Sequence, residues 1–178
     1  QKLQGLSALN EKVSCWFMTS LSAADLTQGL FDSPVDFRSE VIYFLIVDRF
    51  YDATSDEEER QGVWDRGSKQ GLYDKTWTQW GKYWGGNLLG IIEKIPYLKQ
   101  LGVTALWLSP LFEQVDDMQY DRAPMHGYWT KDFKRINPRF LPGGECNGVG
   151  NSSTLRELVD ALHANDIKLV LDVVCNHS

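Results

Sequence analysis

The sequence predicts an α/β fold built on a parallel β-sheet. Three runs rich in β-branched and aromatic residues have the length of buried strands, at residues 40–50, 103–109 and 168–178. Helical patterns separate them, at residues 84–102 and 154–162. The order strand, long loop, helix, strand, long loop, helix, strand is typical of a parallel sheet with right-handed crossovers. With 178 residues, of which 43% are apolar, the chain is long enough for one sizeable core.

The first predicted strand, residues 40–50, reads EVIYFLIVDRF and ends in an acid, Asp48, followed by Arg49. Residues 1–38 lack a sustained periodicity, so we expect a leader or a poorly ordered arm there and a second region at 39–178. The connection 51–83 is long and polar. A connection of this length is usually functional or disordered.

The first predicted helix spans residues 84–102. Asn87 is a plausible N-cap, and Gly102 is a good C-terminal stop. Pro96 argues against one straight helix and predicts a kink or a second short helix that begins at the proline. The second strand, residues 103–109, follows, and then a long loop at 111–152 that contains the segment MHGYWTKDF.

The third unit begins with Thr154 and Glu157, which fit a capping box. A stripe of apolar residues follows, and Asn165 and Asp166 then turn the chain, because both residue types tolerate the left-handed conformation. The last run, residues 168–178, reads KLVLDVVCNHS and is nearly continuously apolar. This pattern predicts a strand that is covered on both faces.

Polar residues interrupt and end this last strand. Asp172 lies within the apolar run, and Asn176 and His177 follow it. A buried acid is costly unless it is hydrogen-bonded, and sites are built at the carboxyl ends of parallel strands. The residues alone leave two interpretations open, a functional site or a hydrogen-bonded core acid followed by an Asn-His turn.

Composition excludes several classes of protein. The net charge is −6 and there is no basic run, which argues against nucleic acid and anionic membranes as partners. The three cysteines, Cys15, Cys146 and Cys175, indicate neither a disulfide framework nor a zinc finger. No run has transmembrane length and no signal peptide is evident, which slightly favours a cytoplasmic over a secreted location. The chain begins without a methionine, so we expect it to be a piece of a longer protein.

Four segments together resemble the α-amylase family, glycoside hydrolase family 13. They are VIYFLIVDRF, WGGNLLGIIEKIPYLKQLGVTALWLSP, HGYWTKDF and LVLDVVCNH, in this order and spacing. Within the family, cyclodextrin glucanotransferases and related bacterial α-amylases look closest. The resemblance implies a TIM (β/α)₈ barrel, which needs roughly 250 residues, so that this chain would hold its first three βα units.

The resemblance also implies a sugar-binding site. His177 matches the histidine that hydrogen-bonds the sugar and stabilises the transition state. Tyr128 matches the tyrosine that stacks on the sugar ring, and His126 matches the histidine beside it. Trp129 belongs to the same motif and is a further candidate for substrate contact.

Calcium is the cofactor that the resemblance implies, in a structural role. Asn176 matches a calcium ligand of the family, with a turn-capping role as the alternative. A second family site would use Asp52, but Asn87 stands where that site has an aspartate. Asp48 and Asp172 match strand acids with structural roles, and Arg49 is a partner for them.

The implied function is that of a retaining hydrolase or transglycosylase that acts on α-1,4-glucosidic bonds of α-glucans or maltooligosaccharides. Retaining glycosidases need two carboxylates about 5 Å apart. In this family the nucleophile Asp and the acid Glu lie on later strands, so we expect the 178 residues to be inactive alone. The alternative is a non-catalytic sugar-binding or transporter-associated relative. A metal hydrolase that uses Asp172, Asn176 and His177 would have too few ligands.

Overall fold

The computed structural model describes residues 37–54, 71–143, 145 and 147–177. The chain divides into two compact units, Gln1–Ser39 and Glu40–Ser178. The described part of the first unit is the 3₁₀ turn η1 (Phe37–Ser39), and the rest of the predicted leader lies outside the described residues. None of the helices in the described ranges has the length and apolar character that crossing a bilayer demands.

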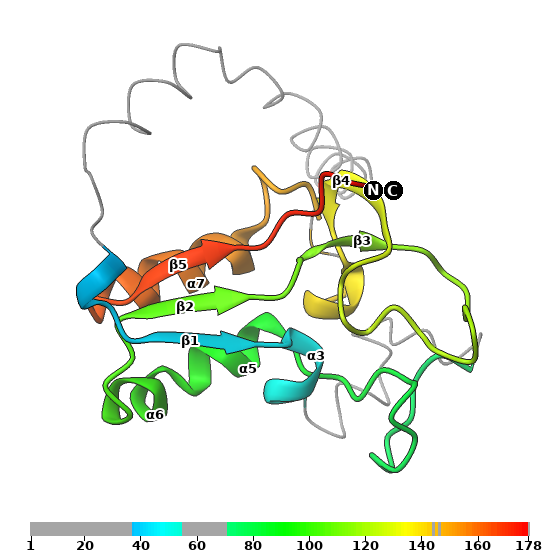
Figure 1. Cartoon of the computed structure of the whole chain (residues 1–178), viewed down its shortest axis with the longest axis horizontal. Coiled ribbons are helices and arrows are strands. Elements are labelled where there is room, and N and C mark those ends of the chain that lie inside the picture. Colours follow the sequence, from blue (N-terminus) through cyan, green and yellow to red (C-terminus); the bar gives the residue numbers. More distant parts are fainter. Residues whose placement is uncertain (1–36, 55–70, 144, 146, 178) are drawn as a thin grey trace, which may run out of the picture. The chain divides into compact units, whose positions relative to one another are not determined.

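Three parallel strands form the centre of the second unit, as the sequence predicts. They are β1 (Ile42–Leu45), β2 (Ala105–Leu108) and β5 (Lys168–Leu171), in the order β1-β2-β5 (Figure 1). The pairing aligns their last residues, Leu45 with Leu108 and Leu108 with Leu171. All three strands therefore end at one edge of the sheet, and within the described residues they do not close into a barrel.

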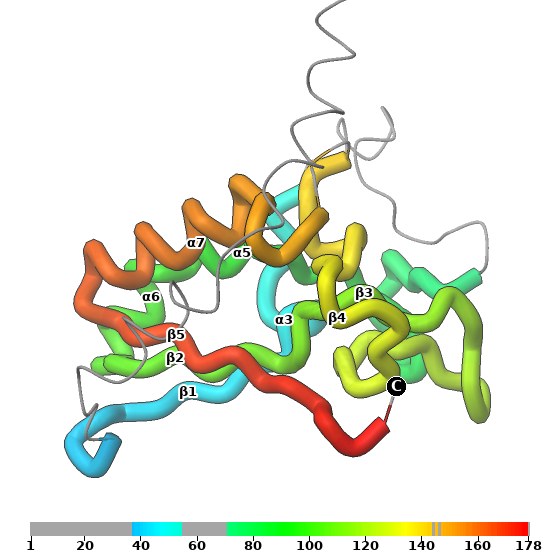
Figure 2. Tube along the Cα trace, turned by 90° about the horizontal axis from the view of Figure 1, so that it is seen from above, coloured from blue at the N-terminus to red at the C-terminus, as the bar shows by residue number. Residues whose placement is uncertain are grey.

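Helices cover one face of this sheet (Figure 2). They are α5 (Leu88–Glu93), α6 (Ile95–Gln100) and α7 (Ser153–Ala164). The core between sheet and helices contains the fully buried side chains of Leu106, Leu108, Ile91 and Leu158. The predicted break at Pro96 is confirmed, since the proline stands in the first turn of α6.

The opposite face of the sheet is exposed in the described structure, so the prediction of strands covered on both faces is wrong here. Ile42 and Phe44 of β1 and Trp107 of β2 are exposed, large and apolar on this face. Phe44 and Trp107 contact each other edge to face, with ring centroids 5.2 Å apart. An apolar residue on this face has no helix to pack against, whereas its neighbour on the other face does. Strand β5 is also shorter than predicted, and Asp172 follows it rather than interrupting it.

The first predicted strand ends earlier than its apolar run. Residues Val47–Phe50 form the short helix α3 instead. The backbone N–H of Arg49 donates to the carbonyl of Ile46 (2.9 Å), and the N–H of Val47 donates to Oγ of Ser109 (3.2 Å). These bonds turn the chain away from the sheet, although the residues themselves favour a strand.

An antiparallel pair lies in the segment predicted as a loop, which corrects that prediction. It consists of β3 (Phe112–Gln114) and β4 (Thr130–Ile136), and the 3₁₀ turn η3 (Pro138–Phe140) follows. Only the end residues of β4, Thr130 and Ile136, are buried. The charged residues between them interrupt the alternation of apolar and polar residues from which strands are predicted.

The N-cap of helix α7 lies two residues before the one that the predicted capping box gives. Its N-cap is Ser152, whose Oγ accepts from the N–H of Leu155 (3.0 Å). Glu145 accepts from Oγ of Ser152 (2.6 Å) and from the N–H of Thr154 (2.9 Å). The Thr154–Glu157 box is therefore wrong, because Glu145, farther away in the sequence, binds the hydroxyl and N–H of Thr154.

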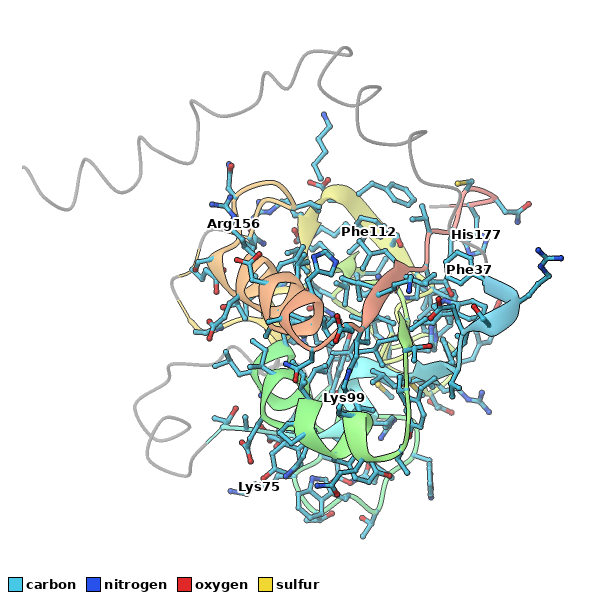
Figure 3. All side chains as sticks on the ribbon, turned by 90° about the vertical axis from the view of Figure 1, so that its left-hand side faces the viewer. Phe37, Lys75, Lys99, Phe112, Arg156 and His177 are labelled. Carbon is cyan, nitrogen blue, oxygen red and sulfur yellow. The ribbon has the colours of Figure 1, made fainter. Side chains whose placement is uncertain are left out.

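The turn after α7 is as predicted, with Asp166 in the left-handed region at φ +57°. Lys99 of α6 donates to the carbonyl of Asn165 and lies 3.6 Å from the carboxylate of Asp166. Figure 3 labels Lys99 and looks onto the end at which the strands begin. These contacts tie two helical units together at the edge opposite to the one where the strands end.

We predict that Glu145→Gln lowers the free energy of unfolding by about 1 kcal/mol at pH 7, because neutral acceptors make weaker hydrogen bonds. Although burial raises it, hydrogen bonds from Ser152 and Thr154 hold the pKa of Glu145 below its ordinary value of 4.5. The contribution of the charge is therefore present above pH 4.5 and lost as the pH falls below it. Denaturant unfolding between pH 3 and pH 7 measures this, and a difference between the proteins that stays constant with pH contradicts it.

Candidate functional site

The candidate site lies at the edge where the three strands end. Tyr128, from the loop that precedes β4, donates its hydroxyl to Oδ2 of Asp172, just after β5 (2.8 Å). Nε2 of His177 lies 3.1 Å from the carbonyl oxygen of Tyr128. The structure thus brings together three residues that the sequence analysis singled out, from segments 44 and 49 positions apart.

His126, Tyr128 and Trp129 form one aromatic cluster. The rings of His126 and Tyr128 stack at 5.7 Å with 23° between their planes, and Trp129 meets His126 edge-on at 4.6 Å. Nδ1 of His126 accepts from the N–H of Tyr128 (3.0 Å), which leaves the ring proton on Nε2. Burial, together with the charge of Arg122, lowers the pKa of His126, so that its imidazole is neutral at pH 7.

Tyr128 is held as a hydrogen-bond donor. Burial, the hydrogen bond to Asp172 and the charge of Asp172 raise the pKa of Tyr128 to about 12. The phenol therefore keeps its proton throughout the physiological range and donates it to the carboxylate. This bond fixes the ring of Tyr128 and the carboxylate of Asp172 in one orientation.

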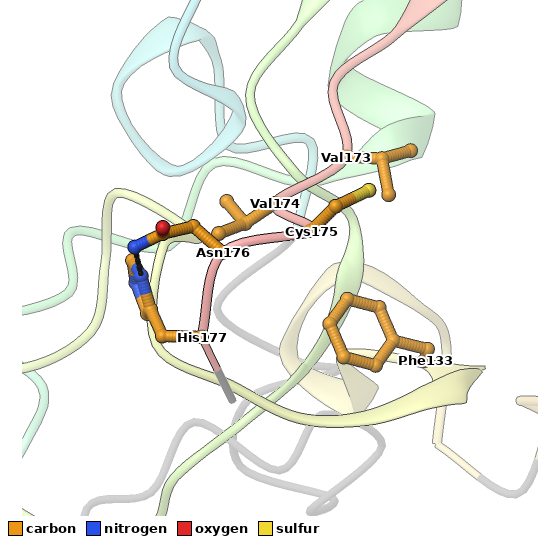
Figure 4. Close-up of a pocket in the computed structure, with 6 residues that line it drawn as sticks. All are labelled: Phe133, Val173, Val174, Cys175, Asn176 and His177. Carbon is orange, nitrogen blue, oxygen red and sulfur yellow. Dashed lines mark hydrogen bonds between the residues drawn. The ribbon is translucent and has the colours of Figure 1, made fainter.

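His177 and Asn176 are exposed beside this cluster. A carbonyl oxygen only accepts, so Nε2–H of His177 donates to Tyr128, and Nδ1 then accepts from Nδ2 of Asn176 (3.2 Å; Figure 4). A cavity of about 470 Å³ lies here, lined by Phe133 of β4 and by residues 173–177. The cavity is open, so a ligand can reach the imidazole.

Two residues that position the aromatic cluster were missed by the sequence analysis. Gln114 is fully buried, and its Oε1 accepts from the N–H of Trp129 (2.8 Å). Gly127 adopts φ +88°, and a Cβ there would lie 2.4 Å from the carbonyl oxygen of Pro110. A glycine inside an aromatic motif is a sequence signal for such a close approach, whereas nothing local marks Gln114.

Asp48 makes its contacts with a different loop. Its carboxylate accepts from the N–H groups of Trp84 (3.0 Å) and Gly85 (3.1 Å), and Nε of Arg49 lies 3.3 Å away. Burial raises the pKa of Asp48 to about 6, although these N–H groups and the Arg49 charge oppose the shift. Asp48 therefore fastens the loop before α5 to α3, the short helix that follows β1.

Asp52 and Asn87 form a hydrogen-bonded pair that does not fit a calcium ion. Oδ1 of Asn87 accepts from the N–H of Gly90 (2.8 Å) as the cap of α5, and this fixes the orientation of the amide. Its Nδ2 then donates to Oδ1 of Asp52 and to Oγ1 of Thr54, both at 3.1 Å. An N–H donor faces the carboxylate where a cation would have to bind, and like partial charges repel.

Asn176 contributes one amide oxygen, a ligand type that calcium prefers. The part of the chain that the structure describes contains no group of three or more His, Cys, Asp or Glu side chains that could hold a metal ion. One amide is not a calcium site, so the metal role of Asn176 stays a prediction.

We predict that Gly127→Ala destabilises the protein more than Gly102→Ala. Both glycines have positive φ, at +88° and +78°, but no atom lies within 4 Å of the Cβ position at Gly102. Strain of this kind costs about 1–3 kcal/mol, and at Gly127 the clash with Pro110 adds to it. Chemical denaturation of both variants measures the difference, and equal losses would exclude a role for the Pro110 contact.

We predict that Asn87→Asp creates a response to calcium. A second carboxylate would face Asp52, so the melting temperature should fall in a chelator and recover in millimolar Ca²⁺. The added substitution Asp52→Asn should abolish this gain relative to the wild type. If Asn87→Asp responds to calcium no more than the wild type does, the two side chains do not face each other as described.

Comparison with known proteins assigns the family. Residues 44–178 match the family model described as "Alpha amylase, catalytic domain". The chain is 38% identical over 147 residues to a cyclomaltodextrin glucanotransferase of Klebsiella oxytoca. The aligned region covers 81% of this chain and 20% of that protein. It is 31% identical over 153 residues to the periplasmic α-amylase of Escherichia coli, covering 82% of this chain and 20% of the relative.

Solved structures agree with the sequence matches. The crystal structure of the γ-cyclodextrin glucanotransferase of alkalophilic Bacillus clarkii aligns with a TM-score of 0.63 at 37% identity, over 78% of this chain and 18% of that one. The chain therefore spans about a fifth of the length of these relatives. It is an incomplete α/β part of a barrel fold, without barrel closure in the described residues. On the extent of the family match, this chain belongs to the α-amylase family.

Proposed function

We propose that this chain is the N-terminal part of the catalytic barrel of a retaining glycoside hydrolase or transglycosylase that acts on α-1,4-linked glucans. The supporting observation is the contact network of Tyr128, Asp172 and His177, which gathers three predicted site residues beside an open cavity. The names of the relatives, cyclomaltodextrin glucanotransferase and α-amylase, point to the same substrate class.

Tyr128 and His177 act on the sugar in different ways under this proposal. The Tyr128 ring, fixed by Asp172, offers an apolar face to the C–H face of a pyranose. The Nε2–H of His177 is bonded to a backbone carbonyl, so a sugar hydroxyl takes over this donor when substrate binds. A donor bond that strengthens as charge develops at the reacting sugar lowers the barrier of the chemical step.

His126 and Trp129 have supporting roles. The neutral imidazole of His126 carries its proton on Nε2 and stacks against Tyr128, so it provides a second donor beside the sugar-stacking ring. Trp129 packs edge-on against His126 and is half-buried. We propose that it contacts the substrate only through the exposed part of its ring.

The carboxylate chemistry is proposed to come from elsewhere in the protein. Double displacement needs a nucleophile and a general acid about 5 Å apart. At this edge of the sheet Asp48 accepts from backbone N–H groups and Asp172 from Tyr128, and both are thereby committed to structural bonds. We therefore propose that the 178 residues alone do not cleave glucan, and that Asn176 serves as one ligand of a calcium site completed by other residues.

We predict that His177→Ala and Tyr128→Phe each lower kcat on maltooligosaccharides by about tenfold or more in the complete protein. The first removes the donor to the sugar, and the second frees the ring and leaves Asp172 without its partner. Steady-state kinetics test this, with melting curves to show that each variant is folded. Tyr97→Phe is a matched control, because Tyr97 is an exposed tyrosine on α6.

Two outcomes contradict the proposal. If the complete wild-type protein binds maltooligosaccharides without cleaving them, it is a non-catalytic sugar-binding relative. If both variants keep wild-type kcat while folded, the residues at this edge do not contact the reacting sugar. Cleavage by the isolated 178-residue chain would contradict the proposed division of the site.

A further inference from the structure

A second aromatic feature lies on the loop 71–84, outside the site described above. Trp77 and Trp80 are 61% and 74% exposed. Large aromatic side chains that a protein leaves in water mark interaction surfaces more often than they mark packing. The net charge of −6 argues against nucleic acid as the partner of these rings.

The backbone that carries Trp77 is strained and firmly held. Trp77 has φ +56°, a conformation that bulky residues rarely adopt. The carboxylate of Asp74 accepts from the N–H and the hydroxyl of Thr76 (3.0 and 2.6 Å) and from the N–H groups of Thr78 (3.0 Å) and Gln79 (2.7 Å). These bonds brace the turn on both sides of Trp77, so its exposed ring is displayed from a fixed backbone.

Trp80 is held in place by contacts with Trp84 and Arg49. Its ring lies 4.7 Å from that of Trp84, and the guanidinium of Arg49 lies 4.0 Å from the centre of the Trp84 ring on the indole face. Nη2 of Arg49 also donates to the carbonyls of Trp80 and Lys82, both at 2.8 Å. Arg49 thus fixes both the backbone of this segment and the ring on which Trp80 rests.

A cavity of about 290 Å³ adjoins these rings. Trp77, Trp84 and Tyr51 line it together with three charged residues, Asp48, Arg49 and Asp52. Flat apolar walls with a few polar groups are typical of small-ligand sites, whose volumes begin at roughly 300 Å³. A sugar ring matches this lining, because it has apolar C–H faces for the indoles and hydroxyl groups for the charged residues.

We propose that Trp77, Trp80, Trp84 and the adjoining cavity form a glucan-binding platform that is distinct from the Tyr128–His177 site. The proposal rests on the proposed function for the choice of α-glucan as ligand. Two exposed indoles three positions apart on one braced turn offer stacking faces to more than one sugar unit, so the platform should favour long chains over short ones.

The test is affinity electrophoresis of the complete protein in native gels that contain amylopectin, with hydroxyethyl cellulose as the control polysaccharide. The variants are Trp80→Ala and Trp77→Asn, since asparagine tolerates the left-handed backbone. Tyr97→Ala is the matched control, an exposed aromatic residue on α6 at the end where the strands begin (Figure 1). Melting temperatures are measured for each variant.

We expect the double variant to bind amylopectin about tenfold or more weakly, as aromatic anchors of an interface typically do when truncated, with Tyr97→Ala binding like the wild type. If amylopectin retards both tryptophan variants as strongly as it retards the wild type, the proposal of a platform is wrong. It is also wrong if the variants have a lower melting temperature but keep their affinity for amylopectin. Cleavage of maltooligosaccharides judges the proposed function separately. If the complete protein cleaves maltooligosaccharides and the double variant keeps its affinity for amylopectin, only the platform proposal is wrong. If the complete protein neither cleaves nor binds α-glucan, the platform proposal and the proposed function are both wrong.

Discussion

The parallel register of β1, β2 and β5 is the constraint on which the rest of the structure depends. Because Leu45, Leu108 and Leu171 are paired in line, the segments that follow the three strands leave the sheet at the same edge. A shift of one residue would move every side chain of a strand to the other face. The positions of Asp48 and Asp172 relative to the loop of Tyr128 are therefore consequences of strand pairing, which the apolar core beneath the sheet fixes.

At this edge two acids support two different loops. Asp48 binds backbone N–H groups of the loop before α5, and Asp172 binds the hydroxyl of Tyr128. These bonds hold each carboxylate in a fixed orientation, Asp48 through both of its oxygens and Asp172 through Oδ2. This engagement supports the proposal that the described residues contact the sugar while carboxylates elsewhere in the protein cleave the bond.

Local patterns predicted those elements whose determinants are local. The cap by Asn87, the break at Pro96 and the left-handed turn at Asp166 each follow from a single residue type. The predictions failed where a distant residue determines the local structure. Glu145 accepts a hydrogen bond from the N-cap Ser152, and Oγ of Ser109 accepts one from the N–H of Val47. The aromatic motif was found through its resemblance to a family. The glycine at 127 signals a close approach without identifying Pro110 as the neighbour, and the bond from Trp129 to Gln114 depends on packing that no sequence pattern displays.

The described parts of the segment between β1 and α5, residues 46–54 and 71–87, are held by hydrogen bonds where the family resemblance suggested a metal. Asp48, Asp74 and Asn87 each accept from backbone N–H groups, and Asn87 also donates to Asp52. Between Asp52 and Asn87 a hydrogen bond takes the place that a cation would need. A backbone in the left-handed region at a bulky residue costs about 1–3 kcal/mol and persists only where its surroundings impose it. The strained backbone at Trp77 is thus held by the hydrogen bonds that Asp74 accepts from the residues on both sides of it.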